Sequence, residues 1–330
     1  MTLSPNLRRQ RLRNLLARLG NDESLVKEYL RRVAPATAAA LLVDPRVVEA
    51  VLSEWESRKA SQPPASKSPL YQAPLLCPGH LPLGPFQGWF SLGHQQIEEN
   101  LLGVPRTLGG LDGYARVDPV LLEAQVCPEC FYASPFRQDF GKPGSAGPDR
   151  SPGVLAALAS PGAREARARM AGPQAGAFGD AARGPETART AFDLALASAR
   201  TARQAGETAA AYKEAHIRLR LARLEEDAGR SGDALAQYEA ALEDFLAYRS
   251  VELPAEILAR TCRQIVALGV LLGRDPVAAQ ERSFLFESRT RAARRENTED
   301  LAAYTRHFTR ADEIWQDRER HRLGNSRPTA

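Results

Sequence analysis

Two short motifs constrain the fold of this chain more than any other feature: Cys77-Pro-Gly-His80 and Cys127-Pro-Glu-Cys130. Each motif places two soft or borderline ligands two residues apart, so that both side chains of a tight turn can reach one ion. Four such ligands complete the tetrahedral shell of a structural zinc ion, with sulfur at about 2.3 Å and nitrogen at about 2.0 Å. We therefore predict one zinc site whose ligands are Cys77, His80, Cys127 and Cys130.

The spacing between the two pairs shapes this prediction. Because 46 residues separate His80 from Cys127, an inserted β-hairpin or loop must bring the turns together. A shell closed by four protein ligands leaves no position for a substrate or an activated water, so the metal would stabilise a segment too small for a full core. Two alternatives stay open: His94 could replace His80 as the nitrogen ligand, or Cys127 and Cys130 could form a lone redox pair. A thioredoxin-like pair would need a surrounding βαβ pattern, which is not visible.

The totals are those of a soluble globular protein, with 43% hydrophobic and 25% charged residues. We expect a cytoplasmic chain, because no apolar stretch approaches the ~20 residues of a membrane span and the first residues lack a secretory signal. A secreted disulfide scaffold would also use more cysteines.

Arginine supplies 39 of the 44 basic residues, which reflects either a compositional bias of the genome or a phosphate-binding surface. Interleaved acidic residues near the C-terminus favour solvated helix faces.

The distribution of apolar, proline and glycine residues predicts a mainly α-helical chain. It comprises a small N-terminal helical unit, a zinc-ribbon-like β module and a C-terminal array of helices similar to tetratricopeptide repeats. The expected boundaries are the helical unit at 1–58, a linker at 59–70, the split zinc-ribbon module at 71–140, a flexible linker with one possible helix at 141–185, the helical array at 186–322, and a disordered tail at 323–330.

The helical array is inferred from its breaks and from one repeat-like unit. Roughly six helices are expected, with Ala234, Tyr238 and Ala241 at the small-large-small spacing of a tetratricopeptide second helix. The five breaks are Gly206, Gly229–Gly232, Leu253-Pro254, Gly273–Pro276 and Glu296–Thr298.

The first twenty residues contain five arginines and no acidic residue. We expect a packed helix with a basic outer face; docking on an anionic surface and an organelle transit peptide are the alternatives.

The sequence shows no catalytic constellation. Cys262 lies in an apolar helical run and is expected to be a buried, inert thiol. The histidines His216, His307 and His321 have no ligand spacing, and there is no phosphate loop, nucleophile elbow or HExxH motif. We therefore expect a protein that is not an enzyme.

The runs Asp112–Pro119 and Val126–Ala133, ending near Phe140, resemble the bacterial family called domain of unknown function 2225, which pairs a CPxC with a later CPxCxYA. Such a family implies a helical region similar to tetratricopeptide repeats, and the segment His216–Leu224 with Ala241, Leu242 and Phe245 is similar to its first long hairpin. The resemblance covers about 71–140 and 205–322.

The chain departs from the family pattern at two positions. His80 stands in place of the second cysteine of the first pair and remains a zinc-competent ligand. Phe131 stands where the family usually has the glycine that allows a positive φ in the turn. The resemblance implies no activity.

These observations favour a non-enzymatic cytosolic adaptor, scaffold or regulatory protein that binds partner proteins, because helical arrays present concave binding surfaces. A zinc-ribbon regulator that binds nucleic acid is the alternative, although Arg106 and Arg116 are the only arginines or lysines between Cys77 and Cys130. A zinc enzyme would require an open coordination site, for example if His80 were not a ligand. Candidate residues for a partner-binding face, which could equally be core, are Tyr212, Leu219, Tyr238 and Phe245.

Overall fold

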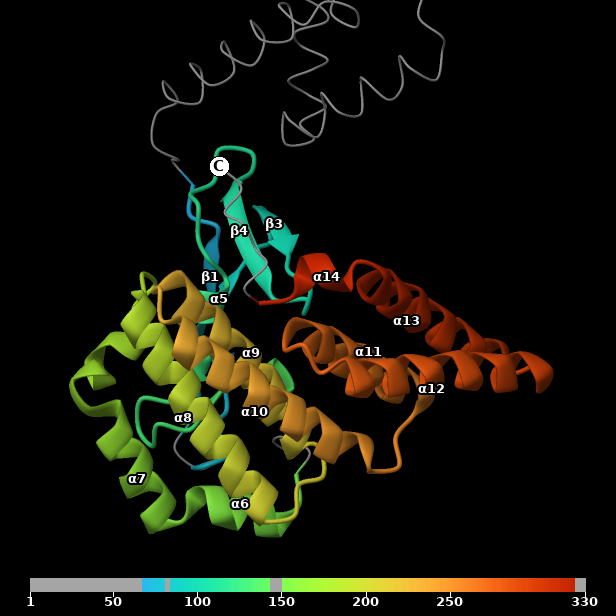
Figure 1. Ribbon diagram of the computed structural model, residues 1–330. Helices are drawn as coiled ribbons and strands as arrows, with labels where there is room; N and C mark the ends of the chain where they lie inside the picture. The colour runs from blue at the N-terminus through green and yellow to red at the C-terminus, as the bar shows by residue number, and fades with distance from the viewer. Residues whose placement is uncertain (1–66, 81–83, 143–149, 324–330) are drawn as a thin grey trace, which may run out of the picture. The chain divides into compact units, whose positions relative to one another are not determined.

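The computed structural model describes residues 67–80, 84–142 and 150–323, all within the unit Lys67–Ala330 (Figure 1). Most of these residues are helical, as the sequence predicts, and the strands are confined to the part of this range before residue 135. The predicted helical unit 1–58, most of the linker 59–70 and most of the tail 323–330 lie outside the described residues.

The β-rich part consists of short antiparallel ladders. Strand β1 (Leu70–Leu75) pairs with β2 (Phe86–Ser91), and β3 (Gln95–Glu99) pairs with β4 (Pro105–Gly110) with an irregularity after Gln96. A short helix then leads into the third ladder, and a 3-10 turn follows it; these elements are α5 (Val120–Glu123), β5 (Gln125–Val126), β6 (Ala133–Ser134) and η2 (Arg137–Asp139). The insertion between the two ligand pairs thus contains the β3–β4 hairpin, as its length suggested.

The segment 150–185 corrects the prediction of a flexible linker with one possible helix. It forms three helical elements: α6 (Pro152–Ala159), α7 (Pro161–Ala171) and the 3-10 helix η3 (Gly172–Gly179). The Ser-Pro-Gly triplets that resemble linker sequence are in fact helix starts, because Ser151 and Ser160 cap the first turns through Val154 N and Ala163 N. Their buried side chains include Val154, Leu158, Ala171 and Phe178.

The remaining helices follow the predicted breaks. Gly229 and Gly273 each take a positive φ just after a helix, and the residue that follows each of them donates back to a carbonyl in the last turn, at 2.8 and 2.7 Å. The helices are α8 (Pro185–Gln204), α9 (Ala210–Asp227), α10 (Ser231–Arg249), α11 (Ala255–Leu271), α12 (Asp275–Arg294), α13 (Thr298–Gln316) and α14 (Arg318–His321).

These helices share one apolar core. α9 packs against α10, and α11, α12 and α13 pack against one another, while α8 lies between α9 and the strands β5 and β6. Leu219, Tyr238 and Phe245, considered above for a partner-binding face, are all buried in this core. Among those four candidates only Tyr212 is partly exposed. None of the helices in the described ranges combines the length and the hydropathy that a membrane span requires.

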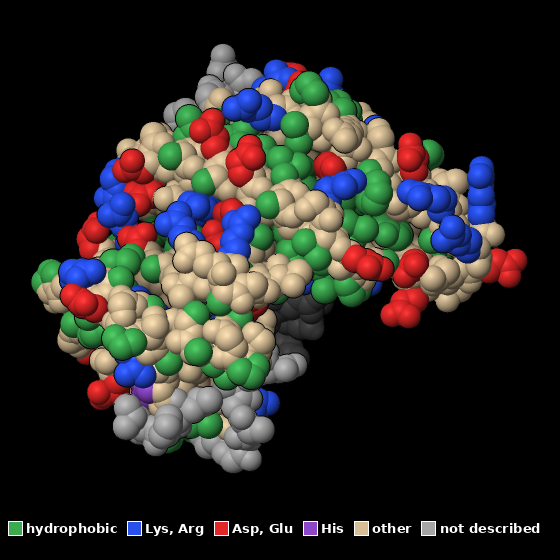
Figure 2. Space-filling model, turned by 90° about the horizontal axis from the view of Figure 1, so that it is seen from below, with side chains coloured by type: hydrophobic (Ala, Val, Ile, Leu, Met, Phe, Trp, Pro, Cys, Tyr) green, Lys and Arg blue, Asp and Glu red, His purple; other side chains and the backbone are tan. Residues whose placement is uncertain are grey.

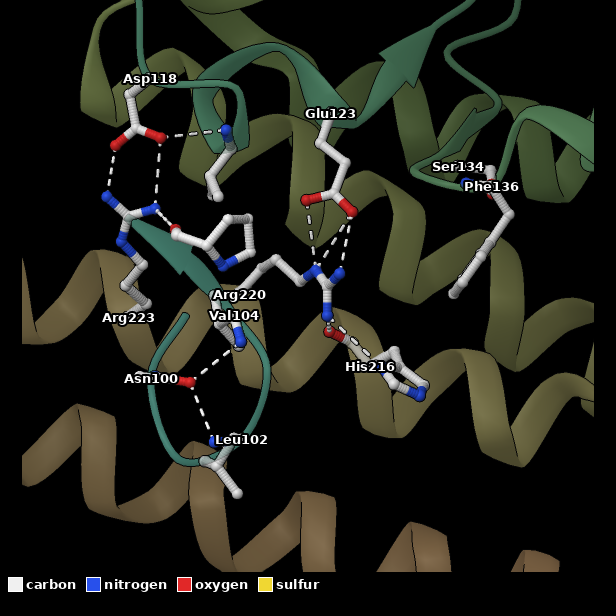
Figure 3. A network of polar contacts seen from close by, with 12 residues as sticks. Asn100, Leu102, Val104, Asp118, Glu123, Ser134, Phe136, His216, Arg220 and Arg223 are labelled. Carbon is white, nitrogen blue, oxygen red and sulfur yellow. Dashed lines mark hydrogen bonds and ion pairs between the residues drawn. The ribbon is translucent and has the colours of Figure 1, made fainter. Parts of the chain in front are cut away.

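The β3–β4 hairpin is anchored to the helices through its loop (Figure 3). The Asn100 side chain accepts hydrogen bonds from the amides of Leu102 (3.0 Å) and Val104 (2.9 Å), which fixes the loop. Gln264 of α11 then donates to the Leu102 carbonyl at 3.1 Å. The inserted hairpin is therefore part of the same folded body as the helices.

Two arginines of α9 hold the segment that follows this hairpin (Figure 3). Arg220 reaches Glu123 at the end of α5, with 3.0 Å between Nη2 and Oε1, and Arg223 binds the carboxylate of Asp118. The side chains of these arginines are largely buried. They serve the internal structure of the protein.

Candidate metal centre

The structure brings the four predicted ligands together in one buried cluster. The sulfurs of Cys77 and Cys130 lie 3.4 Å apart, and Nε2 of His80 lies 2.7 Å from the sulfur of Cys127. All four candidate ligand atoms lie within 4.8 Å of one another. Around a zinc ion the sulfurs would be about 3.8 Å apart. This group could therefore close around a metal ion with small adjustments.

Two tight turns present these side chains. We call Cys77–His80 the first knuckle, which follows β1, and Cys127–Cys130 the second knuckle, which lies between β5 and β6. In the first, the His80 amide donates to the Cys77 carbonyl (3.3 Å) and the Gly79 amide lies 3.4 Å from the Cys77 sulfur. In the second, the Phe131 amide donates to the Cys127 carbonyl at 2.9 Å. The two-residue gap in each motif therefore lets both side chains of a tight turn reach the same cluster, as the sequence predicted.

The residues present fit a metal of zinc's preferences. A Cβ at Gly79 would lie 3.1 Å from the sulfur of Cys130 and 3.6 Å from that of Cys77, so the first knuckle approaches the cluster as closely as a glycine allows. Three thiols and one imidazole nitrogen are soft and borderline donors, which suit zinc and not the oxygen-seeking Ca²⁺ or Mg²⁺. The other ring nitrogen of His80, Nδ1, is buried without a hydrogen-bond partner among the described residues, so Nε2 is the nitrogen that faces the cluster.

His94 is not part of this cluster. Its ring stacks on Tyr114 with 4.1 Å between the ring centroids, and the metal-competent group consists of the other four residues. The alternative in which His94 replaces His80 is therefore wrong for this structure. Cys262 lies apart in α11, fully buried as expected, and its burial raises the pKa of its thiol.

The thiols of the cluster influence one another strongly. Hydrogen bonds to Cys127 and Cys130, together with burial, raise the pKa of Cys77. A hydrogen bond to Cys130, together with burial, raises the pKa of Cys127 to about 12. Hydrogen bonds to the other two cysteines lower the pKa of Cys130. Three thiolates in so small an apolar space would repel one another and lose their hydration, so a divalent cation would be needed to hold them there.

Phe131 adopts a left-handed backbone conformation, which glycine takes more readily than other residues. Its φ is 55°, which costs a residue with a side chain roughly 1–2 kcal/mol. The ring is half-buried and lies 6.4 Å from that of Phe178. Packing of the aromatic side chain therefore offsets backbone strain at this position.

This strain leads to a test that does not depend on the metal. We expect Phe131→Gly to be more stable than Phe131→Ala by about 1 kcal/mol, because both lose the ring and only glycine takes this φ freely. Urea unfolding of the two variants measures the difference. Phe136 is the matched control: it is half-buried at a φ of −95°, so there the alanine variant should be the more stable. An alanine variant at 131 that equals the glycine variant would contradict the left-handed turn.

Two arginines of α7 bind the knuckles, and the sequence did not predict them. Nη2 of Arg164 donates to the carbonyl of Gly79 (2.5 Å), and Nε of Arg167 donates to the carbonyl of Cys130 (3.1 Å). Their i, i+3 spacing places both on one face of the helix, but such pairs are common in an arginine-rich chain. If the Ser-Pro-Gly triplets are taken as helix starts, the i, i+3 spacing of Arg164 and Arg167 is the one sequence signal that indicates a shared contact of this helix face.

Comparisons with known proteins add no relative to this description. No protein-family model matches the chain, and no curated protein and no solved structure matches it either. What can be said about function therefore rests on the geometry of the chain itself.

Proposed function

We propose that this chain is a non-enzymatic adaptor or scaffold, in which a structural zinc ion closes a split ribbon and a tetratricopeptide-like helical array binds partner proteins. The proposal includes membership of the domain of unknown function 2225 family and a cytoplasmic location. The positive φ of Phe131, at the position of the family's usual glycine, supports the first. Free cysteines in the cluster suit a reducing compartment and support the second.

The observation that carries the structural role is the closed, buried donor set. Cys77, Cys127 and Cys130 are at most 3% exposed, and His80 is 6% exposed. Zinc bound by these four groups has its tetrahedral positions filled, which leaves no place for a substrate or for an activated water. When bound, such an ion would supply folding free energy to the ribbon. The walls around it are apolar, with Leu75, Phe140, Val154 and Leu158 among them.

The surface of the array offers a place for a partner. Phe286 of α12 is 48% exposed, and its ring lies 5.6 Å from that of Phe308. The guanidinium of Arg289 covers both rings, at 5.1 and 4.5 Å from their centroids. Exposed aromatic residues beside arginine are typical of the few positions that dominate protein–protein affinity. We propose this aromatic–arginine cluster as a contact for the partner.

Nucleic-acid binding has less support. The arginines of α9 are engaged internally: Arg218 binds Asp244 at 2.7 Å, and Arg220 and Arg223 hold the β-rich part. Figure 2 shows basic and acidic side chains interleaved on the face that it presents. Fluorescence anisotropy with duplex DNA and single-stranded RNA at about 50 mM salt should show no saturable binding; tight binding that weakens steeply with salt would support the nucleic-acid alternative.

The partner-binding proposal can be tested at Phe286. Crosslinking and affinity capture of the tagged full chain from native lysate should recover a specific protein in stoichiometric amount. Phe286→Ser should weaken binding of that partner roughly 5- to 30-fold, because the ring is expected to contribute about 1–2 kcal/mol. Leu235→Ser is the control, because Leu235 lies on α10 and is similarly exposed, at 41%.

Two results would count against this proposal. Recovery of no specific protein would argue against an adaptor altogether. Equal loss of the partner in both variants would show that the aromatic–arginine cluster is not the contact. Circular dichroism of each variant excludes general unfolding as the cause.

A further inference from the structure

Arg167 is the largest fully buried side chain of the described residues. It is 1% exposed; its Nε donates to the Cys130 carbonyl at 3.1 Å, and its Nη2 donates to the Leu158 carbonyl at 2.8 Å. Its Nη1 is buried and has no hydrogen-bond partner within the described ranges. No carboxylate of those ranges forms an ion pair with it, although many other arginines here have one.

A buried guanidinium without a counter-ion is costly. The effective penalty of burying an unpaired ion is several kcal/mol after relaxation, and two neutral carbonyl acceptors offset only part of it. Negative charge nearby would offset the remainder of this cost. The cysteine cluster can carry such charge, and Arg167 binds the carbonyl of Cys130, which belongs to that cluster.

The charge of the loaded centre matches this requirement. A divalent ion bound by three thiolates and one neutral imidazole carries a net charge of −1. One guanidinium neutralises it. Arg167 of α7 binds the carbonyl of Cys130, and Arg164 of α7 binds the carbonyl of Gly79, so α7 contacts both knuckles. The compensating charge is therefore held on this helix.

We propose that Arg167 is the buried counter-ion of the metal–thiolate centre and a determinant of its metal affinity, and that metal binding stabilises the docking of α7 on both knuckles. The proposal rests on the zinc site proposed above. It assigns Arg167 a positioning and electrostatic role: the guanidinium does not ligate the ion, and it stabilises the anionic charge of the thiolate shell.

The test compares three variants of the full chain. Zinc affinity is measured by competition with a chromophoric chelator, and cobalt substitution reports the thiolate shell through its absorption bands. Arg167→Met removes the charge and nearly keeps the length, and should weaken zinc binding roughly 10- to 100-fold, the usual cost of losing an outer partner of a metal site. Arg167→Lys keeps the charge and should retain most of the affinity.

Arg183→Met is the matched control. Arg183 is also buried, at 6% exposed, and it donates to two carbonyls, those of Ala124 and Phe178. Because it lies outside the cysteine cluster, its loss should lower stability and leave the zinc affinity unchanged. Equal loss of zinc affinity in this control and in Arg167→Met would mean that any buried arginine acts through general stability, and would overturn the proposal.

The remaining outcomes also decide. If Arg167→Met binds zinc like the wild-type chain, or if Arg167→Lys loses as much affinity as Arg167→Met, the charge of Arg167 does not determine the zinc affinity. Either result would overturn the proposal. If Arg167→Met does not fold, Arg167→Lys decides alone: near wild-type affinity supports the proposal, and a loss contradicts it. A wild-type chain that binds no zinc at all would refute the zinc site itself, which is a different result from an unchanged affinity in the variants.

Discussion

Replacing Cys127 by serine is expected to abolish stoichiometric zinc binding and to lower the free energy of unfolding by more than about 4 kcal/mol. Cys127 is fully buried, and it belongs to the apolar cluster that joins the β-rich part to α6 and α8. A serine oxygen is a poor ligand for zinc in a thiolate shell, and its hydroxyl would be left in apolar surroundings. Inductively coupled plasma mass spectrometry gives the metal content, and urea unfolding gives the stability.

Cys262 provides the control for this substitution. It too is a fully buried cysteine, but it lies in α11 away from the cluster. Cys262→Ala should keep the full zinc content and cost about 1 kcal/mol, as for a small cavity. A Cys127→Ser chain that keeps one tightly bound zinc, or that unfolds like Cys262→Ala, would remove the case for a structural metal.

The second large effect is expected at Asp139, the centre of a buried charge network. Its carboxylate accepts from Ser134 Oγ (2.6 Å), Lys213 Nζ (2.6 Å) and Arg150 Nη2 (3.0 Å). Both cations also contact Glu207, at 2.5 and 3.3 Å. Asp139→Ala would leave two buried cations with a single carboxylate, and should cost about 3–5 kcal/mol.

Urea unfolding with Glu165→Ala as the control would test this estimate. Glu165 pairs with Arg169 at 2.7 Å on α7, but both side chains are about 70% exposed, so its loss should cost less than about 0.5 kcal/mol. Comparable costs at the two positions would show that burial of the network around Asp139 adds nothing. Because Asp139 is not among the candidate ligands, Asp139→Ala should still bind zinc, and a chelator should lower its stability further. Cys127→Ser has no bound zinc for the chelator to remove.

Features set by local chemistry could be predicted from the sequence. The gap in each cysteine pair determines a turn with two ligands, and Gly229 and Gly273 end helices because the left-handed C-terminal position favours glycine. The same reasoning failed for 150–185. There, serine, proline and glycine are shared by linkers and by helix starts, and the difference lies in the burial of Val154 and Leu158, a tertiary effect.

Long-range polar contacts could not be predicted from the sequence either. Nothing near Arg167 in the chain shows that its partner is the carbonyl of Cys130, 37 residues earlier. Likewise, nothing near Arg223 in the chain indicates that it bonds to Asp118, 105 residues away. Such pairings depend on the packing of the helices and leave no periodic trace.

The residues that cover the metal centre are synthesised after its ligands. The four ligands are complete once residue 130 has been made, but α7 and Ala202 of α8, which cover the cluster, come later in the chain. A nascent chain that stops short of α8 can therefore collect the ligands but cannot shield them from water. We expect the knuckles to bind metal weakly and exchange it rapidly while the chain is still on the ribosome, and to retain it only after the α8 segment has emerged.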